Sequence, residues 1–399
     1  MGKTELTINP DTFTNEMKLL LLCSIKDLSS QQEEKIRSLL NDDIDWGLFL
    51  KLVAKHRIHT LVYSHLTRID SPAVNKKALK TLEQRCQKNL MDAVKQTGEL
   101  ISLARLMAAN GIRAFSLKGP LLARTIYGDI AYRKSKDLDI LICEQDIEKT
   151  AQLLLANGYK NADLEVDLSP KQKAHIIKTN HHFVYQKPTG VIVELHWRDN
   201  SESNEFQFEE LWHNRRELVL SGQTINVLAA EDEFLYLLRH GSIHGYNRLR
   251  WLCDIAEIIK SNQLDWSGIV KRATKLDIME TLVQAIILCD RLLTIAIPEV
   301  LWEPAASNRL GQKMAIMALP FIIEPDEKAI GAGGRLDIYF RKYTLLRSKG
   351  IKAKGAYLMA RFYPGLIDYE AMDFNDRFFF MYYLTRPFFK MQRIMNRSS

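Results

Sequence analysis

The chain has 399 residues, enough for two or three folded units, and its 46% hydrophobic and 26% charged residues exclude wholesale disorder. Five scattered cysteines without a Cys-x-x-Cys pair argue against a zinc ribbon or a disulfide framework, so we expect a reducing, cytoplasmic location. A net charge of +7 suggests an anionic ligand such as a nucleotide, a nucleic acid or a membrane surface, although a merely basic surface explains it equally well.

The pattern of apolar residues does not predict a membrane-spanning or secreted protein. The best apolar run, at 314–323, is shorter than the about 18 residues that a transmembrane helix needs. The first residues lack the basic start and apolar segment of a secretory signal. We therefore expect no transmembrane helix.

Hydrophobic periodicity divides the chain into four regions. Helical spacing dominates the start and the second half, whereas strand-like runs are confined to the middle. The predicted regions are a helical N-terminal region at 1–95, an α/β core at 96–228, a helical domain at 229–323, and a linker with a helical, aromatic and basic C-terminal region at 324–399. Residues 324–337 are polar and glycine-rich, which is typical of a linker or a long loop.

The core begins with a strand, a tight turn and a helix. Residues 112–118 read as a short β run, and Pro120 then suits the first turn of a helix that continues to Gly128. The run 137–142 predicts a buried strand followed by an amphipathic helix that ends at Gly158. Two further strands form a predicted hairpin, one at 181–186 and the other at 191–197.

Two aspartates interrupt the apolar strand at 137–142. Because alternate side chains of a strand share a face, Asp137 and Asp139 point the same way, about 6.6 Å apart along the backbone. Glu194 offers a third carboxylate on the strand that we expect to lie beside this one. Hard oxygen ligands favour Mg²⁺ or Mn²⁺, and three such acids can support two-metal phosphoryl transfer. A solvated acidic pair at a strand edge is the alternative.

At these motifs the chain resembles the uncharacterised bacterial nucleotidyltransferase family of the polymerase-beta-like nucleotidyltransferase superfamily. The similarity rests on "LKGPLLARTIYGDIAYRKSKDLDILI", "VIVELHW" and "RHGSIHGYNRLRWLCDI", and it covers roughly residues 95–260. It implies an α/β (α+β) nucleotidyltransferase core with a small mixed sheet, flanked by N-terminal and C-terminal helical regions. It also implies Mg²⁺- or Mn²⁺-dependent transfer of a nucleoside monophosphate from ATP or another NTP to a hydroxyl, with Asp137, Asp139 and Glu194 as catalytic metal ligands.

The phosphate-binding turn departs from the superfamily's usual pattern. The usual turn is Gly-Gly or Gly-Ser, whereas Lys118 precedes Gly119 here, and the loop from Gly119 to Asp137 is longer than the common spacing. The turn opens a predicted helix, whose first N–H groups and dipole suit a triphosphate. Which group replaces the family's Ser hydroxyl on the triphosphate is left open by this departure, and Lys118 is a candidate because it carries positive charge.

Two groups of side chains near the acids are candidates for binding or proton transfer. Arg133 and Lys136 flank the aspartates and either bind the nucleotide or the acceptor or are surface charges. His182 and His196 lie on the two hairpin strands. Each is a candidate proton acceptor for the attacking hydroxyl or a neutral histidine packed beside the metal.

A second histidine pair lies further along the chain. His240 and His244 are four residues apart on a predicted helix and therefore share a face. They are candidates for contact with the acceptor or the nucleotide, or for proton transfer. Zinc binding with Asp254 is a weaker alternative, because the pair lacks the glutamate of HExxH and a clear third ligand.

The C-terminal segment "RFFFMYYLTRPFFKMQRIMNR" mixes aromatic and basic residues. Membrane-surface segments have this composition, so weak peripheral membrane contact is one interpretation. A helix packed on the body of the protein with a basic rim is the other.

The sequence favours an enzyme that transfers a nucleoside monophosphate to a small molecule, a glycan precursor or a protein and releases pyrophosphate. The alternative is a non-catalytic nucleotide-binding regulatory or scaffold protein. We expect an NTP donor and a hydroxyl-bearing acceptor, and no specific nucleic acid, since no RNA-binding aromatic motif is found.

Overall fold

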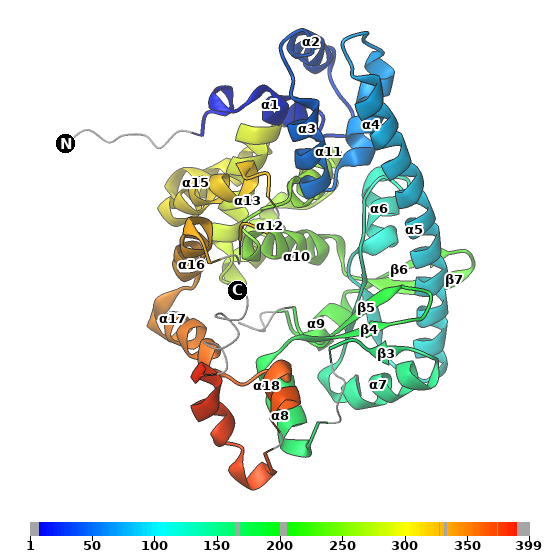
Figure 1. The fold of residues 1–399 in the computed structure, drawn as a ribbon, viewed down its shortest axis with the longest axis vertical. Helices are drawn as coiled ribbons and strands as arrows, with labels where there is room; N and C mark the ends of the chain where they lie inside the picture. Colours follow the sequence, from blue (N-terminus) through cyan, green and yellow to red (C-terminus); the bar gives the residue numbers. More distant parts are fainter. Residues whose placement is uncertain are drawn as a thin grey trace, which may run out of the picture.

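The computed structural model describes residues 8–163, 168–199, 206–326, 328–330, 333–372 and 374–388. A five-stranded sheet of order β1-β2-β5-β4-β3 lies between the long helix α5 and helix α10 (Figure 1). The β2–β5 pair is parallel, and the other pairs are antiparallel. The strands are β1 (Ala114–Ser116), β2 (Leu138–Ile142), β3 (Lys160–Asn161), β4 (His182–Gln186) and β5 (Ile192–His196). This small mixed sheet among helices confirms the predicted fold class.

The N-terminal region is helical, as predicted. Side-chain caps begin several of its helices: Thr14, Ser29, Asp45 and Asn75 each accept a backbone N–H of the first turn. Its elements are η1 (Pro10–Thr12), α1 (Asn15–Leu22), α2 (Ser30–Leu39), α3 (Trp46–His56), α4 (His59–Ile69) and α5 (Lys76–Ala109). The predicted boundary at residue 95 falls inside α5, and the division into four regions stays a prediction.

The strand, turn and helix at the start of the core are confirmed, together with the 181–197 hairpin. Helix α6 (Gly119–Tyr127) ends at Gly128, whose left-handed φ of 79° suits a glycine cap. The remaining core elements are η2 (Glu144–Asp146), α7 (Ile147–Ala156), α8 (Pro170–Thr179), α9 (Phe208–His213), β6 (Arg216–Leu220) and β7 (Gln223–Val227). The β6–β7 hairpin was not among the predicted elements.

The two faces of the sheet belong to different environments. Leu138, Ile140 and Val193 pack into a core shared with the α5 residues Leu103 and Met107. Leu141 belongs instead to the larger core that includes the helical domain. Because side chains alternate along a strand, the second face also carries Asp139 and Glu194. Asp139 is buried on this face, whereas Glu194 stays partly exposed.

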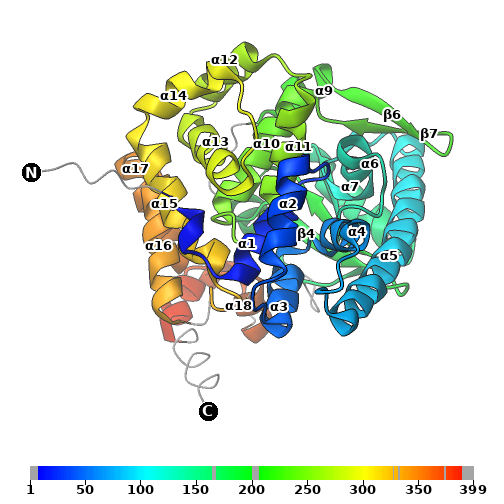
Figure 2. The same ribbon diagram turned by 90° about the horizontal axis from the view of Figure 1, so that it is seen from above.

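The helical domain packs beside the sheet and the N-terminal helices (Figure 2). Its elements are α10 (Ala230–Ile243), α11 (Leu249–Ser261), α12 (Trp266–Lys275), α13 (Met279–Leu293), η3 (Glu299–Leu301), α14 (Trp302–Ser307) and α15 (Arg309–Ile323). Among the described residues, no helix is both long enough and apolar enough to cross a bilayer.

The C-terminal region is also helical. It comprises α16 (Arg335–Arg347), α17 (Gly350–Met359), η4 (Ala360–Phe362), α18 (Leu366–Ala371), η5 (Asp376–Phe378) and a helix at 381–388. Residues 324–326 and 328–330 of the predicted linker are not helical, while 327, 331 and 332 lie outside the described residues. Phe379 and Tyr382 are buried, whereas Phe380, Leu384 and Phe388 are exposed. Both interpretations of this segment therefore stay open, and its end beyond 388 lies outside the described residues.

Candidate active site

The pairing of β2, β5 and β4 brings the predicted acids and two histidines onto one face. Asp139 lies opposite Glu194 on the parallel strand, and His196 lies opposite His182 across the hairpin. One ligand atom from each of Asp139, Glu194 and His196 lies within 4.8 Å of those of the other two. The strands thus assemble at one point residues that are up to 57 positions apart in the sequence.

Asp139 is at the centre of this group. Lys118 Nζ lies 2.9 Å from Asp139 Oδ1, and the two side chains are 9% and 2% exposed. His196 Nε2 lies 3.3 Å from the same oxygen and 3.3 Å from Glu194 Oε2. Burial raises the pKa of the Asp139 carboxyl, but Lys118 and His196 outweigh burial and the net shift is downward. Asp139 is therefore held as a carboxylate.

Asp137 and Glu194 differ from Asp139 in their charge environment. Burial, followed by repulsion from Asp139 and Glu194, raises the pKa of Asp137. Burial also raises the pKa of Glu194, but the contact with His196 contributes to a net decrease. Asp137 precedes β2 and is not in the group of ligand atoms within 4.8 Å. Asp139 and Glu194 are therefore the better supported metal ligands, and a ligand role for Asp137 stays a prediction.

The Lys118-Gly119 turn is held against the strand that carries Asp139. Leu117 N donates to Asp139 O at 3.0 Å, which brings Lys118 beside the carboxylate. Gly119 has a left-handed φ of +80°, and a Cβ placed there would lie 3.5 Å from Leu138 Cδ2. Glycine suits this backbone conformation. Pro120 follows in the first turn of α6, as predicted.

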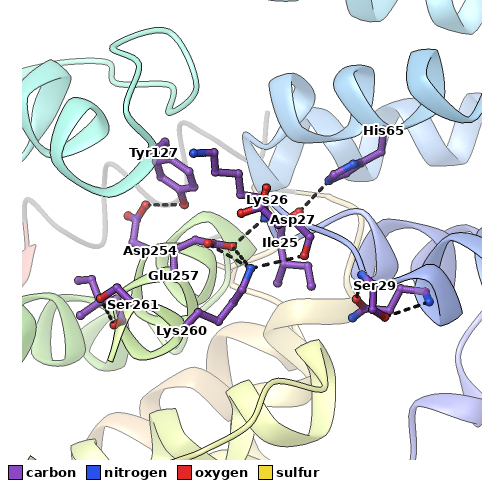
Figure 3. A network of polar contacts seen from close by, with 12 residues as sticks. Ile25, Lys26, Asp27, Ser29, His65, Tyr127, Asp254, Glu257, Lys260 and Ser261 are labelled. Carbon is purple, nitrogen blue, oxygen red and sulfur yellow. Dashed lines mark hydrogen bonds and ion pairs between the residues drawn. The ribbon is translucent and has the colours of Figure 1, made fainter. Parts of the chain in front are cut away.

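Arg133 contacts a different partner from the one expected. Its Nε lies 2.8 Å from Asp254 Oδ2, with both side chains almost fully buried. Tyr127 donates its hydroxyl to the other oxygen of Asp254 at 3.1 Å, as Figure 3 shows. These contacts tie α6 and the loop before β2 to α11. The role proposed for Arg133 in nucleotide binding stays a prediction, as does that of Lys136, whose side chain is exposed.

The same part of α11 is also tied to the N-terminal region. Glu257 accepts the backbone N–H of Lys26 at 2.7 Å and lies beside Lys260 (Figure 3). His65 on α4 contacts Ile25 O through Nε2 at 2.7 Å. The helix that anchors Arg133 is thus fixed to the N-terminal helices as well.

His182 and His196 lie together, with a third histidine that the sequence analysis did not select. The ring centroids of His181 and His182 are 4.3 Å apart, and those of His182 and His196 are 5.0 Å apart. Burial, followed by the charge of His196, lowers the pKa of His182 to about 4. Burial likewise lowers the pKa of His181. The adjacent pair "HH" at the start of a predicted strand was the available signal for His181.

His240 and His244 lie on α10 and just beyond its end, and both rings contact Trp251. The ring centroids of His240 and His244 are 4.9 Å apart, and His244 stacks on Trp251 at 5.0 Å. Burial, followed by the charge of Lys118, lowers the pKa of His244 to about 4. The same two causes lower the pKa of His240. Asp254 contacts Arg133 and Tyr127 instead of completing a zinc site. Within the described residues, neither histidine belongs to a group of three metal-ligand candidates.

Tyr236 and Arg250 are two further neighbours that the sequence analysis missed. Lys118 Nζ lies 5.7 Å from the centre of the Tyr236 ring. Arg250 is buried and donates to Lys134 O, and burial, followed by Arg133 and Arg57, lowers its pKa to about 9. The net shift of the Asp137 pKa is upward, mainly through burial, and the charge of Arg250 partly opposes that increase. Both residues lie in helices far from the strand motifs in sequence, so spacing alone did not indicate them.

A cavity of about 810 Å³ is lined mainly by residues of α8, the start of α13, the end of α16, α17 and the helix at 381–388, with Arg239 from α10. Thr179 lines it, two residues before His181, and so does Arg239, next to His240. Arg347 also lines the cavity. After the larger effects of burial, Lys118 and Arg248, which lower the pKa of His244, Arg347 lowers it further and Glu194 raises it. The described lining of the cavity does not include His181, His182, His196, His240 or His244, so its link to the site is through neighbours in the chain. Its cationic lining residues are Lys178, Arg239, Arg347, Lys349, Arg361 and Arg386.

The model of a family described as "uncharacterised nucleotidyltransferase" matches residues 42–294, which is more than half of the chain. The chain belongs to this family. As a member of a nucleotidyltransferase family it is assigned to the transferases. An antigenic nucleotidyltransferase-like protein from Paracoccidioides brasiliensis is 18% identical, with a TM-score of 0.32, over 50% of this chain and 93% of its own. No curated protein matches the chain.

Proposed function

We propose that this nucleotidyltransferase transfers a nucleoside monophosphate from an NTP to a hydroxyl and releases pyrophosphate. The observation that carries the proposal is the direct pairing of Asp139 with Glu194 on parallel strands, beside the Lys118-Gly119 turn. The carboxylates suit the metal ion of a metal-bound triphosphate, and the start of helix α6 suits its phosphate oxygens.

The donor set fits a hard divalent cation. Asp139 is kept ionised, Glu194 is partly exposed, and their ligand atoms lie within 4.8 Å of each other. Carboxylate oxygens are preferred ligands of Mg²⁺ and Mn²⁺. We propose that Asp139 and Glu194 hold the ion, with Asp137 as a further ligand. When bound, such an ion neutralises phosphate charge and favours in-line displacement.

The remaining residues orient the substrates. We propose that free N–H groups in the first turn of α6, which begins at Gly119 and includes Pro120 without an N–H, bind phosphate oxygens, and the helix dipole favours negative charge there. Lys118 supplies a buried ammonium close to Asp139. His182 has a lowered pKa and is therefore neutral near pH 7, as a proton acceptor for the attacking hydroxyl must be.

The cationic cavity, whose lining residues Thr179 and Arg239 are close in the chain to His181 and His240, is the proposed acceptor site. Several of its charged side chains have partners: Lys349 contacts Asp277, and Arg386 contacts Asp368. Cationic residues nevertheless predominate in the lining. An acceptor that carries negative charge near its hydroxyl, such as a phosphorylated small molecule or glycan precursor, suits this cavity better than a neutral one.

A second candidate function is nucleotide binding without transfer, in a regulatory or scaffold protein. The observation that favours it is the close contact of Lys118 with Asp139, because the ammonium occupies part of the coordination space of a metal ligand. Tight NTP binding without pyrophosphate release in the presence of any acceptor would support this alternative. Cytoplasmic location and the lack of a specific nucleic-acid partner stay predictions.

The test is product formation. The protein is incubated with each of the four NTPs, Mg²⁺ or Mn²⁺, and mixtures of phosphorylated and neutral hydroxyl compounds, and products that gain a nucleoside monophosphate are sought by mass spectrometry. Glu194→Gln should abolish product and pyrophosphate. Glu209→Gln is the control, because Glu209 is an exposed acid that contacts Arg113. Full turnover by Glu194→Gln would refute the assignment.

A further inference from the structure

Three imidazole rings meet beside the carboxylates, and they form a ligand group of their own. One ring nitrogen from each of His181, His182 and His196 lies within 4.8 Å of those of the other two. The three ring centroids are 4.3, 5.0 and 5.7 Å apart. His196 is shared with the Asp139 and Glu194 group, but His181 and His182 are not part of that group.

The backbone around these histidines is held in place. Trp197 N donates to His181 O at 3.1 Å, and Asn180 Oδ1 accepts the backbone N–H of His181 at 2.9 Å. The Trp197 indole donates to Ile177 O at 3.0 Å. The segment that carries His181 is therefore fixed against the end of β5, where His196 lies.

The nitrogen atoms of these rings lack the partners that buried polar atoms need. Nδ1 of His181, of His182 and of His196 is buried and has no hydrogen-bond partner among the described residues. His196 is itself 5% exposed. Each buried unsatisfied polar atom costs about 1 to 3 kcal/mol, so three such atoms together call for a ligand that they can bind.

The surroundings of His196 set its tautomer. Its Nε2 lies 3.3 Å from Asp139 Oδ1 and 3.3 Å from Glu194 Oε2 without hydrogen-bond geometry to either, and the two carboxylates favour the ring proton on Nε2 electrostatically. The lone pair is then on Nδ1. Metal-binding histidines commonly use this arrangement, in which the second nitrogen donates to a carboxylate and orients the ring.

We propose that His181, His182 and His196 form a second cation site, for a borderline transition metal of the Zn²⁺ class. Burial by itself lowers the pKa of His196, but Asp139 and Glu194 produce a net increase, so a metal ion must displace a proton from that ring. Three imidazole nitrogens are then ligands for Zn²⁺, Co²⁺ or Ni²⁺ and poor ligands for Mg²⁺, which requires oxygen. At Zn–N distances of about 2.1 Å the ligand nitrogens would be roughly 3.4 Å apart, so the rings close in slightly on binding. Its ligands are separate from the phosphate-binding turn, but His196 also contacts Asp139 and Glu194, and a His182 that holds the ion does not act as the proton acceptor.

The test is cobalt and zinc binding to the chelator-treated full chain. Titration with Co²⁺ is followed by its visible absorption, and bound Zn²⁺ is counted by elemental analysis. We expect one ion per chain, retained in a large excess of Mg²⁺. In the His181→Gln, His182→Gln double variant the affinity should fall more than about 100-fold, beyond the range for an outer-shell contact. The single variants and circular dichroism check that the loss is not unfolding.

His240→Gln with His244→Gln is the matched control, because these histidines are also buried and adjacent. This variant should bind Co²⁺ like the wild type. Unchanged binding in the His181, His182 variant, loss of binding in the control, or displacement of the ion by Mg²⁺ would each overturn the proposal. Mg²⁺-dependent NTP binding, measured separately, reports on the carboxylates and the phosphate-binding turn and not on His181 or His182.

Discussion

Lys118 and Asp139 form a buried ion pair in which the ammonium nitrogen lies 2.9 Å from the carboxylate oxygen. Asp139 lowers the energetic cost of burying the lysine, and the net shift of the Lys118 pKa is upward although burial by itself lowers it. The pair keeps both groups charged in the interior, beside Glu194 and His196. Any cation at Asp139 therefore enters a site where one charge is already compensated.

Removing the lysine should destabilise the protein and sensitise it to cations. Lys118→Met leaves Asp139 charged and without its ammonium partner, which should cost about 3 to 5 kcal/mol in the free energy of unfolding. Urea denaturation measures this cost. Mg²⁺ or Mn²⁺ should restore part of the lost stability, more than it stabilises the wild type. The double variant with Asp139→Asn should lose less than the sum of the single variants, and additive losses would contradict direct coupling.

The turn at Gly119 should not tolerate a side chain. Gly119→Ala places alanine at a φ of +80° and should lower stability by about 1 to 3 kcal/mol, mainly through backbone strain, since the nearest contact of the new Cβ is an ordinary 3.5 Å. Gly98→Ala is the control, because Gly98 lies inside α5 and a Cβ there meets nothing within 4 Å. That variant should gain about 0.5 to 1 kcal/mol. Thermal melts that shift in the same direction would contradict this account.

Loss of the Arg133–Asp254 pair should lower the stability of the fold more than it lowers the affinity for NTP. Arg133→Met leaves Asp254 buried with only the Tyr127 hydroxyl and should cost about 3 to 5 kcal/mol. Arg113→Met, which breaks an exposed pair with Glu209, should change the urea midpoint little. If Arg133→Met unfolded like the wild type but bound NTP much more weakly, the triphosphate-binding role predicted from sequence would be supported instead.

Buried neutral histidines should make the fold sensitive to acid. Burial, followed by Lys134 and Arg85, lowers the pKa of His59 from 6.5 to about 4. Between these values the unfolded chain binds a proton that the folded chain does not, so stability falls as pH decreases from about 6.5 to 4. Urea denaturation should show a loss of about 2 kcal/mol from this histidine between pH 7 and pH 5.

The pH dependence can be assigned to His59 by substitution. His59→Gln should reduce the difference in stability between pH 7 and pH 5, whereas the exposed His213→Gln should leave it unchanged. An unaltered pH dependence in His59→Gln would mean that this ring takes up its proton in the folded state.

Local patterns in the sequence predicted the parts of the site that are continuous in the chain. The Lys118-Gly119 turn, the strand with Asp139 and the hairpin with Glu194 are confirmed, because glycine, proline and period-two alternation act over a few residues. The position of Glu194 beside Asp139 followed from expecting these strands to be neighbours, and their register confirms it.

The missed features depend on contacts between distant segments. Asp254 is 121 residues from Arg133, and no local pattern distinguishes an arginine that will meet it from one that will bind phosphate. Tyr236 meets Lys118 only because α10 packs across the sheet. The β6–β7 hairpin was also missed, although Ser221 and Gly222 at its turn both have positive φ.

The central claim is that Asp139 and Glu194 hold the cation that binds an NTP, and calorimetric titration tests it most directly. ATP, GTP, CTP and UTP are titrated with and without Mg²⁺ into the wild type and into Glu194→Gln, a partly exposed position that faces His196, so the variant should fold. We predict Mg²⁺-dependent binding of at least one NTP by the wild type, weakened at least about tenfold in the variant, as for loss of a charged ligand. Equal affinity in both proteins, or binding that does not depend on Mg²⁺, would contradict the claim.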